Sequence, residues 1–304
     1  MAAAIIAGLS AASFAETYAV CIGINQYGSS KDADGHEVDH NLRGAVNDAN
    51  SMRDILVKHY GAHEGNIKML RDKDADADNV VDGIRWLIKT AKPGDQVVFA
   101  FSGHGGRLED KDEPDGHESV IVLADGKLLP GKLMGEFAKM EAANGVHATI
   151  VLDSCFSGGM SRPGGEMFQP RLKSYGDIKV GPRSKKVDLT KASMANLVLR
   201  TKGDEAPKGS YAFYYAGKAD QPTIDLPQLG DTPPHGLFTT LLMSVIEDNP
   251  KTPMTDMFEA INATIAALNK QIKEKRPDFE GFKQAPDFEA STEARAKQPL
   301  VVGS

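Results

Sequence analysis

Short apolar runs of strand length alternate along this chain with longer segments of helical periodicity, and this alternation restricts the fold more than any other feature. Strands are predicted at Tyr18–Ile24, Asn66–Leu70, Gln96–Phe101, Ser119–Leu123, His147–Leu152 and Tyr211–Ala216. Helices are predicted at Leu42–Gly61, Val80–Ala91, Gly131–Ala143, Gly236–Glu247 and Pro253–Lys275. Alternating elements form crossover units, so we predict an α/β fold with a mainly parallel central sheet and helices on both faces.

Two stretches break the pattern. Arg107–Gly116 is charged and is predicted to be a loop, and Gly158–Gly209 is rich in Gly, Pro, Ser, Lys and Arg. We therefore expect a leader over residues 1–15, a larger segment over 16–160, a flexible basic loop over 161–209, and a smaller segment of the same domain over 210–304.

The first 15 residues are apolar and small, and they end in Ser13-Phe14-Ala15. This pattern is typical of a cleaved secretory leader and predicts export, although the basic start of such leaders is missing and a plain hydrophobic arm is the alternative. Elsewhere the sequence has no run approaching the ~20 apolar residues of a membrane helix, so no membrane segment is predicted.

Charge and cysteine content exclude several classes of function. The formal net charge of -7 gives no overall basic field that would attract nucleic acid. The two cysteines, Cys21 and Cys155, cannot form a disulfide framework and fit no zinc-ligand spacing. Cys21 lies inside an apolar run and is predicted to be a small buried residue of a strand.

Cys155 and His104 have a different setting, because each follows directly on a predicted strand. Parallel strands end at the same edge of a sheet, so both side chains are expected there. A thiol attacks a carbonyl as the thiolate, and histidine can take up and return the proton near neutral pH. The Ser102–Gly106 motif could alternatively be only a turn. His36, His40, His59, His63 and His117 lie in polar contexts and are predicted to be solvated.

The residues around His104 and Cys155 also carry a family resemblance. Phe99–Gly106 resembles the histidine motif of caspase-related peptidases, and Ile150–Gly159 resembles their cysteine motif, with about 50 residues between histidine and cysteine as in caspases. The Asp-Ser-Cys-x-Ser-Gly form is similar to metacaspases and their bacterial relatives. Ile22–Tyr27 and Leu42–Ala49 resemble the first strand and helix of the same family.

The resemblance implies the caspase-hemoglobinase fold and a cysteine endopeptidase. In that mechanism Cys155 forms an acyl-enzyme, His104 is the acid and base, and the N–H groups of Gly105 and Cys155 form the oxyanion hole. It implies no third catalytic side chain. The alternative is a caspase-like module that binds or regulates without catalysis. The sequence leaves the oligomeric state open.

The resemblance also places Asp48, Ser102 and Asp153 in the pocket for the residue before the cleaved bond. Two carboxylates in one pocket favour a cation between them, so we predict protein or peptide substrates cleaved after Arg or Lys. Asp-directed cleavage is the alternative. Asp48 could instead be an exposed helix residue, and Asp153 could stabilise a turn.

Two further features concern cofactors and processing. No cofactor is predicted to be required. The acidic loop that contains Asp112, Asp115 and Glu118 could bind Ca²⁺, but a solvated loop is the preferred interpretation because the spacing fails the EF-hand pattern. If the pocket accepts basic residues, the basic loop is a candidate for autocatalytic cleavage, with a merely solvated loop as the alternative.

Overall fold

The computed structural model describes residues 15–32, 34–110, 116–155, 171–172, 174–177, 209–218, 221–228 and 231–302. The leader, most of the basic loop, and Asp112 and Asp115 lie outside this range. Predictions that concern them therefore stay predictions.

The centre of the fold is a six-stranded sheet with the order β15-β12-β9-β5-β1-β4. Its strands are β1 (Thr17–Gly23), β4 (Ile67–Arg71), β5 (Gln96–Ser102), β9 (His147–Asp153), β12 (Ser210–Tyr215) and β15 (Asp287–Ala290). Neighbouring strands from β12 to β4 run parallel, and β15 runs antiparallel to β12. The prediction of a mainly parallel sheet is confirmed.

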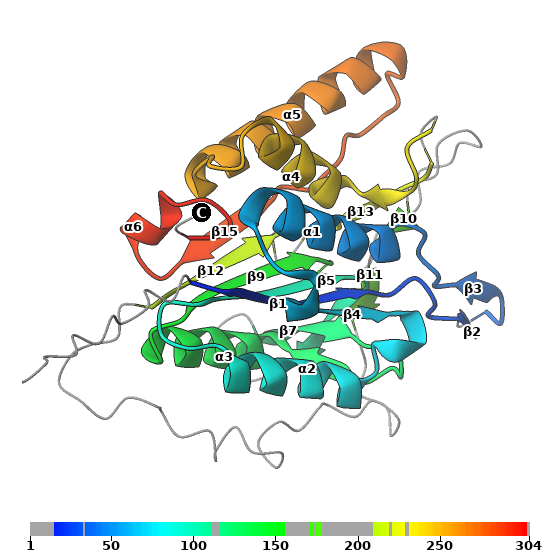
Figure 1. Cartoon of the computed structure of the whole chain (residues 1–304). Helices are drawn as coiled ribbons and strands as arrows, with labels where there is room; N and C mark the ends of the chain where they lie inside the picture. Colours follow the sequence, from blue (N-terminus) through cyan, green and yellow to red (C-terminus); the bar gives the residue numbers. More distant parts are fainter. Residues whose placement is uncertain are drawn as a thin grey trace, which may run out of the picture.

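Helices cover both faces of this sheet. In Figure 1, α1 (Ala45–Tyr60), α4 (Leu237–Asp248) and α5 (Met254–Lys275) lie on one side of the strands, and α2 (Ala77–Thr90) and α3 (Gly131–Ala143) lie on the other. The short helix α6 (Glu293–Ala296) contacts β12 and β15. Within the described residues, no helix combines the length and apolar character needed to cross a membrane.

The strands supply two apolar cores because successive side chains point to opposite faces. In β1, Val20 and Ile22 join the core under α2 and α3, while Ala19 and Cys21 join the core under α1, α4 and α5. Cys21 has no exposed surface, and burial raises the pKa of its thiol to about 12. The prediction of a structural Cys21 is confirmed.

Helix boundaries follow local signals in the sequence. The carboxylate of Asp76 accepts a hydrogen bond from the N–H of Asn79 and caps the start of α2. Gly61 ends α1 with a left-handed φ of 66°. These two residues therefore mark the start of α2 and the end of α1.

Shorter strands form three smaller sheets around this core. They are β2 (Ser29–Lys31), β3 (Glu37–Asp39), β6 (Gly105–Glu109), β7 (His117–Val122), β8 (Leu128–Pro130), β10 (Arg171–Leu172), β11 (Ser174–Asp177), β13 (Ile224–Leu226) and β14 (His235–Gly236). The sheets are β11-β6-β7-β8, β10-β13-β14 and β2-β3. Single-turn 3₁₀ helices lie at Glu64–Asn66 and Asp72–Asp74.

One sequence prediction is wrong in part. Arg107–Gly116 was expected to be a loop, but β6 continues through Glu109 and pairs with β7. The physical reason is Leu108, which is fully buried in a small apolar cluster with Val120, Val122 and Leu128. The buried side chain of Leu108 stabilises the strand, although the charged residues around it in the sequence indicated a loop.

Candidate active site

His104 and Cys155 lie at the same edge of the central sheet. Each stands two residues beyond the end of a strand, and these strands, β5 and β9, are parallel neighbours whose last residues, Ser102 and Asp153, are paired. The His104 and Cys155 residues are 2% and 0% exposed. The structure therefore places the two residues that the sequence singled out at one edge of the sheet, beyond paired strand ends.

Gly105 shows how closely the two chain segments approach. A Cβ atom at this position would lie 1.7 Å from the carbonyl oxygen of Cys155, closer than any real side chain could come. Only glycine lets the residue after His104 contact the backbone of Cys155 in this way. The predicted oxyanion-hole residues Gly105 and Cys155 are thus in direct contact.

The imidazole of His104 is held from both sides. Its Nε2 lies 2.6 Å from the carbonyl oxygen of His40, and its ring centroid lies 4.4 Å from that of Tyr27. The Tyr27 hydroxyl accepts a hydrogen bond from the backbone N–H of His104 (2.9 Å) and donates one to the carbonyl of Val122 (3.1 Å). A carbonyl only accepts, so Nε2 carries the proton and Nδ1 is the basic nitrogen of the neutral ring.

Sequence reasoning missed both of these partners. Tyr27 lies in the Ile22–Tyr27 motif, so that motif held a signal that was available. His40 acts through its main-chain carbonyl, which no side-chain pattern encodes. Its imidazole lies 2.7 Å from the Ser30 hydroxyl, and burial lowers its pKa.

The expectation of a solvated ring is wrong for His59, whose side chain is 13% exposed and lies 3.1 Å from Glu247.

The sulfur of Cys155 is bound by Thr223, which immediately precedes β13. The backbone N–H of Thr223 donates to Sγ at 2.7 Å, and the threonine hydroxyl lies 3.4 Å from Sγ. The N–H donor stabilises the thiolate, whereas the Thr223 carbonyl oxygen, 3.6 Å from Sγ, can accept a hydrogen bond from the thiol. Thr223 therefore offers the sulfur a partner in either protonation state. Thr223 and Cys155 both have no exposed surface, so the candidate nucleophile Cys155 is covered in this structure. No sequence feature had marked this residue.

The three predicted pocket residues line a single small cavity. Asp48, Ser102 and Asp153 share it with Thr239 and the apolar side chains of Ile22, Ala49, Met52, Ala100, Phe101 and Val151. Ser102 donates its hydroxyl proton to Asp48 at 2.6 Å, and Thr239 donates its hydroxyl proton to Asp153 at 2.6 Å. Asp48 is 2% exposed, so the alternative of an exposed helix residue is wrong.

Both carboxylates also face the start of α4. The N–H of Gly236, which precedes the helix, donates to Asp48 at 2.9 Å, and the N–H of Thr239 donates to Asp153 at 3.2 Å. Helix N-termini carry a partial positive charge that stabilises carboxylates. The negative charge of the pocket is therefore compensated by the fold.

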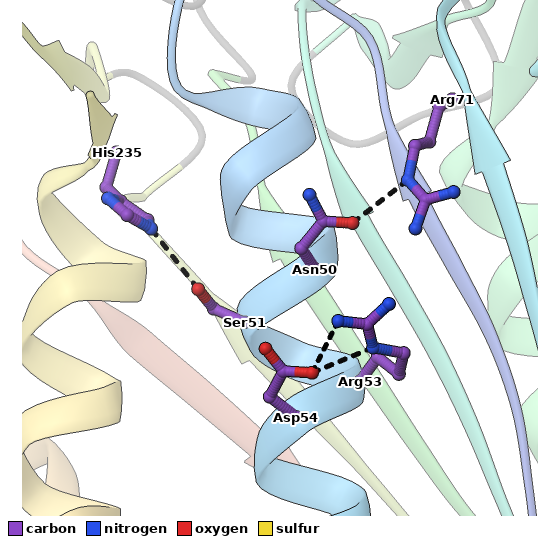
Figure 2. Close-up of polar contacts among 6 residues, drawn as sticks. All are labelled: Asn50, Ser51, Arg53, Asp54, Arg71 and His235. Atoms are coloured by element: carbon purple, nitrogen blue, oxygen red, sulfur yellow. Dashed lines mark hydrogen bonds and ion pairs between the residues drawn. The ribbon is translucent and has the colours of Figure 1, made fainter. Parts of the chain in front are cut away.

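Polar contacts along α1, the helix that carries Asp48, join it to neighbouring elements. The imidazole Nε2 of His235, just before α4, lies 3.2 Å from the Ser51 hydroxyl, and Arg71 at the end of β4 donates to the side-chain oxygen of Asn50 at 2.9 Å. Figure 2 shows both contacts on α1. The neighbouring Arg53 and Asp54 form an exposed ion pair on the same helix. The first two contacts fix α1 against both the start of α4 and the sheet.

The acidic loop is described at its two ends. Asp110 and Glu118 both lie 3.2 Å from the Lys132 ammonium group, and these carboxylates raise the pKa of that lysine. Glu118 is therefore already paired with a cation. Among the described residues, Asp32, Asp34 and His36 form another group with metal-ligating atoms close together, all of them exposed.

Comparison with known proteins identifies the part of the chain that carries this site. Residues 18–162 match the family model of the metacaspase, peptidase C14 domain. Metacaspase-1 of Kluyveromyces lactis is 34% identical over 151 residues, which cover 46% of this chain and 33% of that protein. Metacaspase-6 of Arabidopsis thaliana is 26% identical over 272 residues, which cover 86% of this chain and 71% of that protein. The match spans about a third of the length of the Metacaspase-1 proteins of Kluyveromyces lactis and Eremothecium gossypii.

Solved structures agree with the fold. Protein GSU0716 from Geobacter sulfurreducens aligns over 93% of this chain and 97% of its own, with a TM-score of 0.58 and 21% identity. Caspase-1 from Spodoptera frugiperda aligns over 91% of this chain and 86% of its own, with a TM-score of 0.50 and 9% identity. At these identities the likeness supports the architecture alone.

Proposed function

We propose that this chain is a cysteine endopeptidase that cleaves after Arg or Lys, because residues 18–162 match the metacaspase, peptidase C14 domain and are similar to the curated metacaspases. The observation that carries the proposal is the placement of Cys155 and His104 beyond two paired central strands, with an N–H donor on the sulfur.

The geometry gives each group a role. Nδ1 of His104 takes the proton of the Cys155 thiol, and the N–H of Thr223 stabilises the thiolate that results. The sulfur attacks the substrate carbonyl, and the N–H groups of Gly105 and Cys155 stabilise the oxyanion. His104 protonates the leaving amine and then takes a proton from the water that hydrolyses the thioester. The His40 carbonyl keeps Nε2 protonated throughout.

The preference for basic residues rests on the paired carboxylates. Asp48 and Asp153 line one cavity, and a guanidinium or ammonium group between them would replace the donors that Ser102 and Thr239 now supply. An acidic side chain would meet two like charges there and would be rejected. The cavity is small, so a basic side chain requires the start of α4 to move outward.

The test is a panel of fluorogenic peptides with Arg, Lys or Asp before the cleaved bond, with and without Ca²⁺. We expect Arg and Lys peptides to be cleaved, Asp peptides to be left intact, and Cys155→Ala and His104→Ala to be inactive. Equal rates with Ca²⁺ and with EDTA are expected, since no cofactor is proposed. Hydrolysis of none of the peptides would favour a non-catalytic module, and hydrolysis of the Asp peptide would favour the caspase-like specificity.

A pair of variants tests the pocket. Asp153→Asn removes one of the two negative charges and should reduce kcat/KM for Arg peptides by about 100-fold, the effect of losing a buried charge pair of 2–3 kcal/mol. Asp82→Asn, on the opposite face in α2 and 69% exposed at its side chain, is the matched control and should have no effect. Equal loss in both variants would show that the pocket assignment is wrong.

Localisation belongs to the same proposal. We propose that the chain is exported and that its leader is removed before Glu16. N-terminal sequencing of the protein recovered from a secreting host should begin at Glu16, and recovery of the intact leader in the cytoplasm would contradict export.

A further inference from the structure

The side chain of Asn41 closes the base of the hairpin that β2 and β3 form ahead of α1. Its Oδ1 accepts the backbone N–H groups of Tyr27 at 2.8 Å and of Gly28 at 2.9 Å. Beside it, the N–H of His40 donates to the carbonyl of Gly28 at 2.9 Å. These hydrogen bonds join the chain just before β2 to the chain just after β3, and a single side-chain oxygen accepts two of them.

The two chain segments joined in this way carry two groups that contact the His104 imidazole. The carbonyl oxygen of His40 lies 2.6 Å from Nε2 of His104. The ring of Tyr27 lies against the imidazole, with 4.4 Å between the centroids, and its hydroxyl accepts the backbone N–H of His104 at 2.9 Å. Asn41 directly follows His40 and binds the N–H of Tyr27, so its side-chain amide links the carbonyl to the ring.

The carbonyl of His40 decides which ring nitrogen of His104 carries the proton. A neutral imidazole has one N–H, and a carbonyl oxygen can only accept. The contact therefore selects the tautomer with the proton on Nε2 and leaves Nδ1 as the basic nitrogen. This selection lasts only while the carbonyl stays within hydrogen-bond distance of Nε2. A shift of the hairpin base by about 1 Å would lengthen the contact past that distance and remove the selection.

We propose that Asn41 is a positioning residue for proton transfer: its side-chain oxygen keeps the His40 carbonyl on Nε2 and so sets the tautomer of His104. This inference deepens the proposed function and rests on it, because the tautomer matters to activity only if Nδ1 takes the proton of the Cys155 thiol. Asn41 is half-buried and belongs to neither large apolar core, so its replacement leaves the packing of the central sheet intact. The effect of a variant can therefore be assigned to the hairpin base.

The first measurement reads the tautomer without relying on activity. The full chain, isotope-labelled at its histidine ring nitrogens, is studied by NMR at about pH 8, where an ordinary histidine is neutral. It carries Cys155→Ala, so no thiol can give the ring a second proton, and the His104 signals are those absent from His104→Gln. We expect the Nε2–H tautomer alone when Asn41 is present and a mixture of both tautomers in Asn41→Ala. Asn41→Asp retains an oxygen that accepts both N–H groups and should keep the Nε2–H tautomer.

The second measurement is kcat for the fluorogenic Arg peptide, with Cys155 in place. A positioned acid–base group contributes about 100-fold or more to the rate, so a mixed tautomer should lower the kcat of Asn41→Ala by about 10-fold with KM unchanged. Asn41→Asp should recover most of this loss. The matched control is Asn269→Ala in α5, because Asn269 is also half-buried and its Oδ1 also accepts a backbone N–H, that of Phe282 at 2.6 Å. This control should keep the wild-type tautomer and kcat.

Several outcomes would overturn the inference. The Nε2–H tautomer alone in Asn41→Ala, or a kcat equal to that of wild type, would show that Asn41 does not position the imidazole. A mixture in Asn269→Ala would show that the tautomer responds to the loss of any such contact. If Arg and Lys peptides are hydrolysed while the tautomer in Asn41→Ala is unchanged, this inference fails and the proposed function stands. If the tautomer responds but wild type hydrolyses no peptide, the proposed function fails, and the role of Asn41 in proton transfer fails with it.

Discussion

Replacing Gly105 with alanine tests the contact on which the candidate site depends. The added methyl carbon would lie 1.7 Å from the carbonyl oxygen of Cys155 and 2.8 Å from its carbonyl carbon. Real Cβ atoms essentially never come closer than 3.0 Å to such atoms, so the two chain segments must separate by more than 1 Å. Because both contacts are backbone atoms, no rotamer change can relieve them.

The expected magnitude follows from this displacement. Misplacing reacting groups by 1 Å costs about 100-fold in rate, so kcat/KM for Arg peptides should fall by about 100-fold in Gly105→Ala. The unfolding free energy should fall by about 1–3 kcal/mol, as for other overpacked positions. The assay pairs initial rates on the fluorogenic Arg peptide with thermal unfolding followed by circular dichroism.

Gly135→Ala is the matched control. Gly135 lies within α3, and a Cβ there meets nothing within 4 Å. That variant should keep wild-type activity and gain about 0.5–1 kcal/mol of stability, because alanine loses less backbone entropy in a helix. Wild-type kcat/KM in Gly105→Ala would refute the reasoning, since it would mean that the approach of His104 to Cys155 does not depend on this backbone contact.

Two further predictions concern histidines. Tyr27→Phe keeps the ring against His104 but removes the hydroxyl that joins the His104 N–H to the Val122 carbonyl. We expect kcat to fall by about 10-fold with KM unchanged, and the free energy of unfolding to fall by about 1–2 kcal/mol. An unchanged kcat and pH–rate profile would rule out a positioning role for Tyr27. Burial and then Arg295 lower the pKa of His147, so the folded state favours the neutral ring, and the free energy of unfolding should fall as pH drops below about 6.5. His147→Gln should show a shallower dependence in chemical denaturation between about pH 8 and pH 5, and an equal slope would contradict this cause.

Elements with a strong period could be predicted from the sequence because burial imposes that period. The helix Gly131–Ala143 has the predicted bounds, and the predicted strand His147–Leu152 differs from β9 by one residue. Short strands such as β13 and β14 escaped prediction. They have three and two residues, too few for alternation to appear, and partners distant in the chain define them.

In the candidate site, too, some residues could be predicted from the sequence and others could not. His104 and Cys155 could be found because motif and strand position agree, and the pocket residues could be found through the family resemblance. Thr223 and His40 could not be found, since the shortest contact of each with the site is made by a main-chain atom, the N–H of Thr223 and the carbonyl of His40, which side-chain patterns do not encode. Residue type identifies a reactive side chain directly, whereas the position of a backbone donor or acceptor can be known only from the folded structure.

The position of β5 and β9 inside the six-stranded sheet has a consequence for control of the protein. Each strand is hydrogen-bonded on both edges, by β1 and β9 for β5 and by β5 and β12 for β9. Amide exchange at Phe101 and Leu152 should thus require global opening, whereas the short pairings of β13 can open alone. Regulation of this protein would therefore act by exposing His104 and Cys155 to solvent. It could not act by separating β5 from β9, because that separation requires the sheet to unfold.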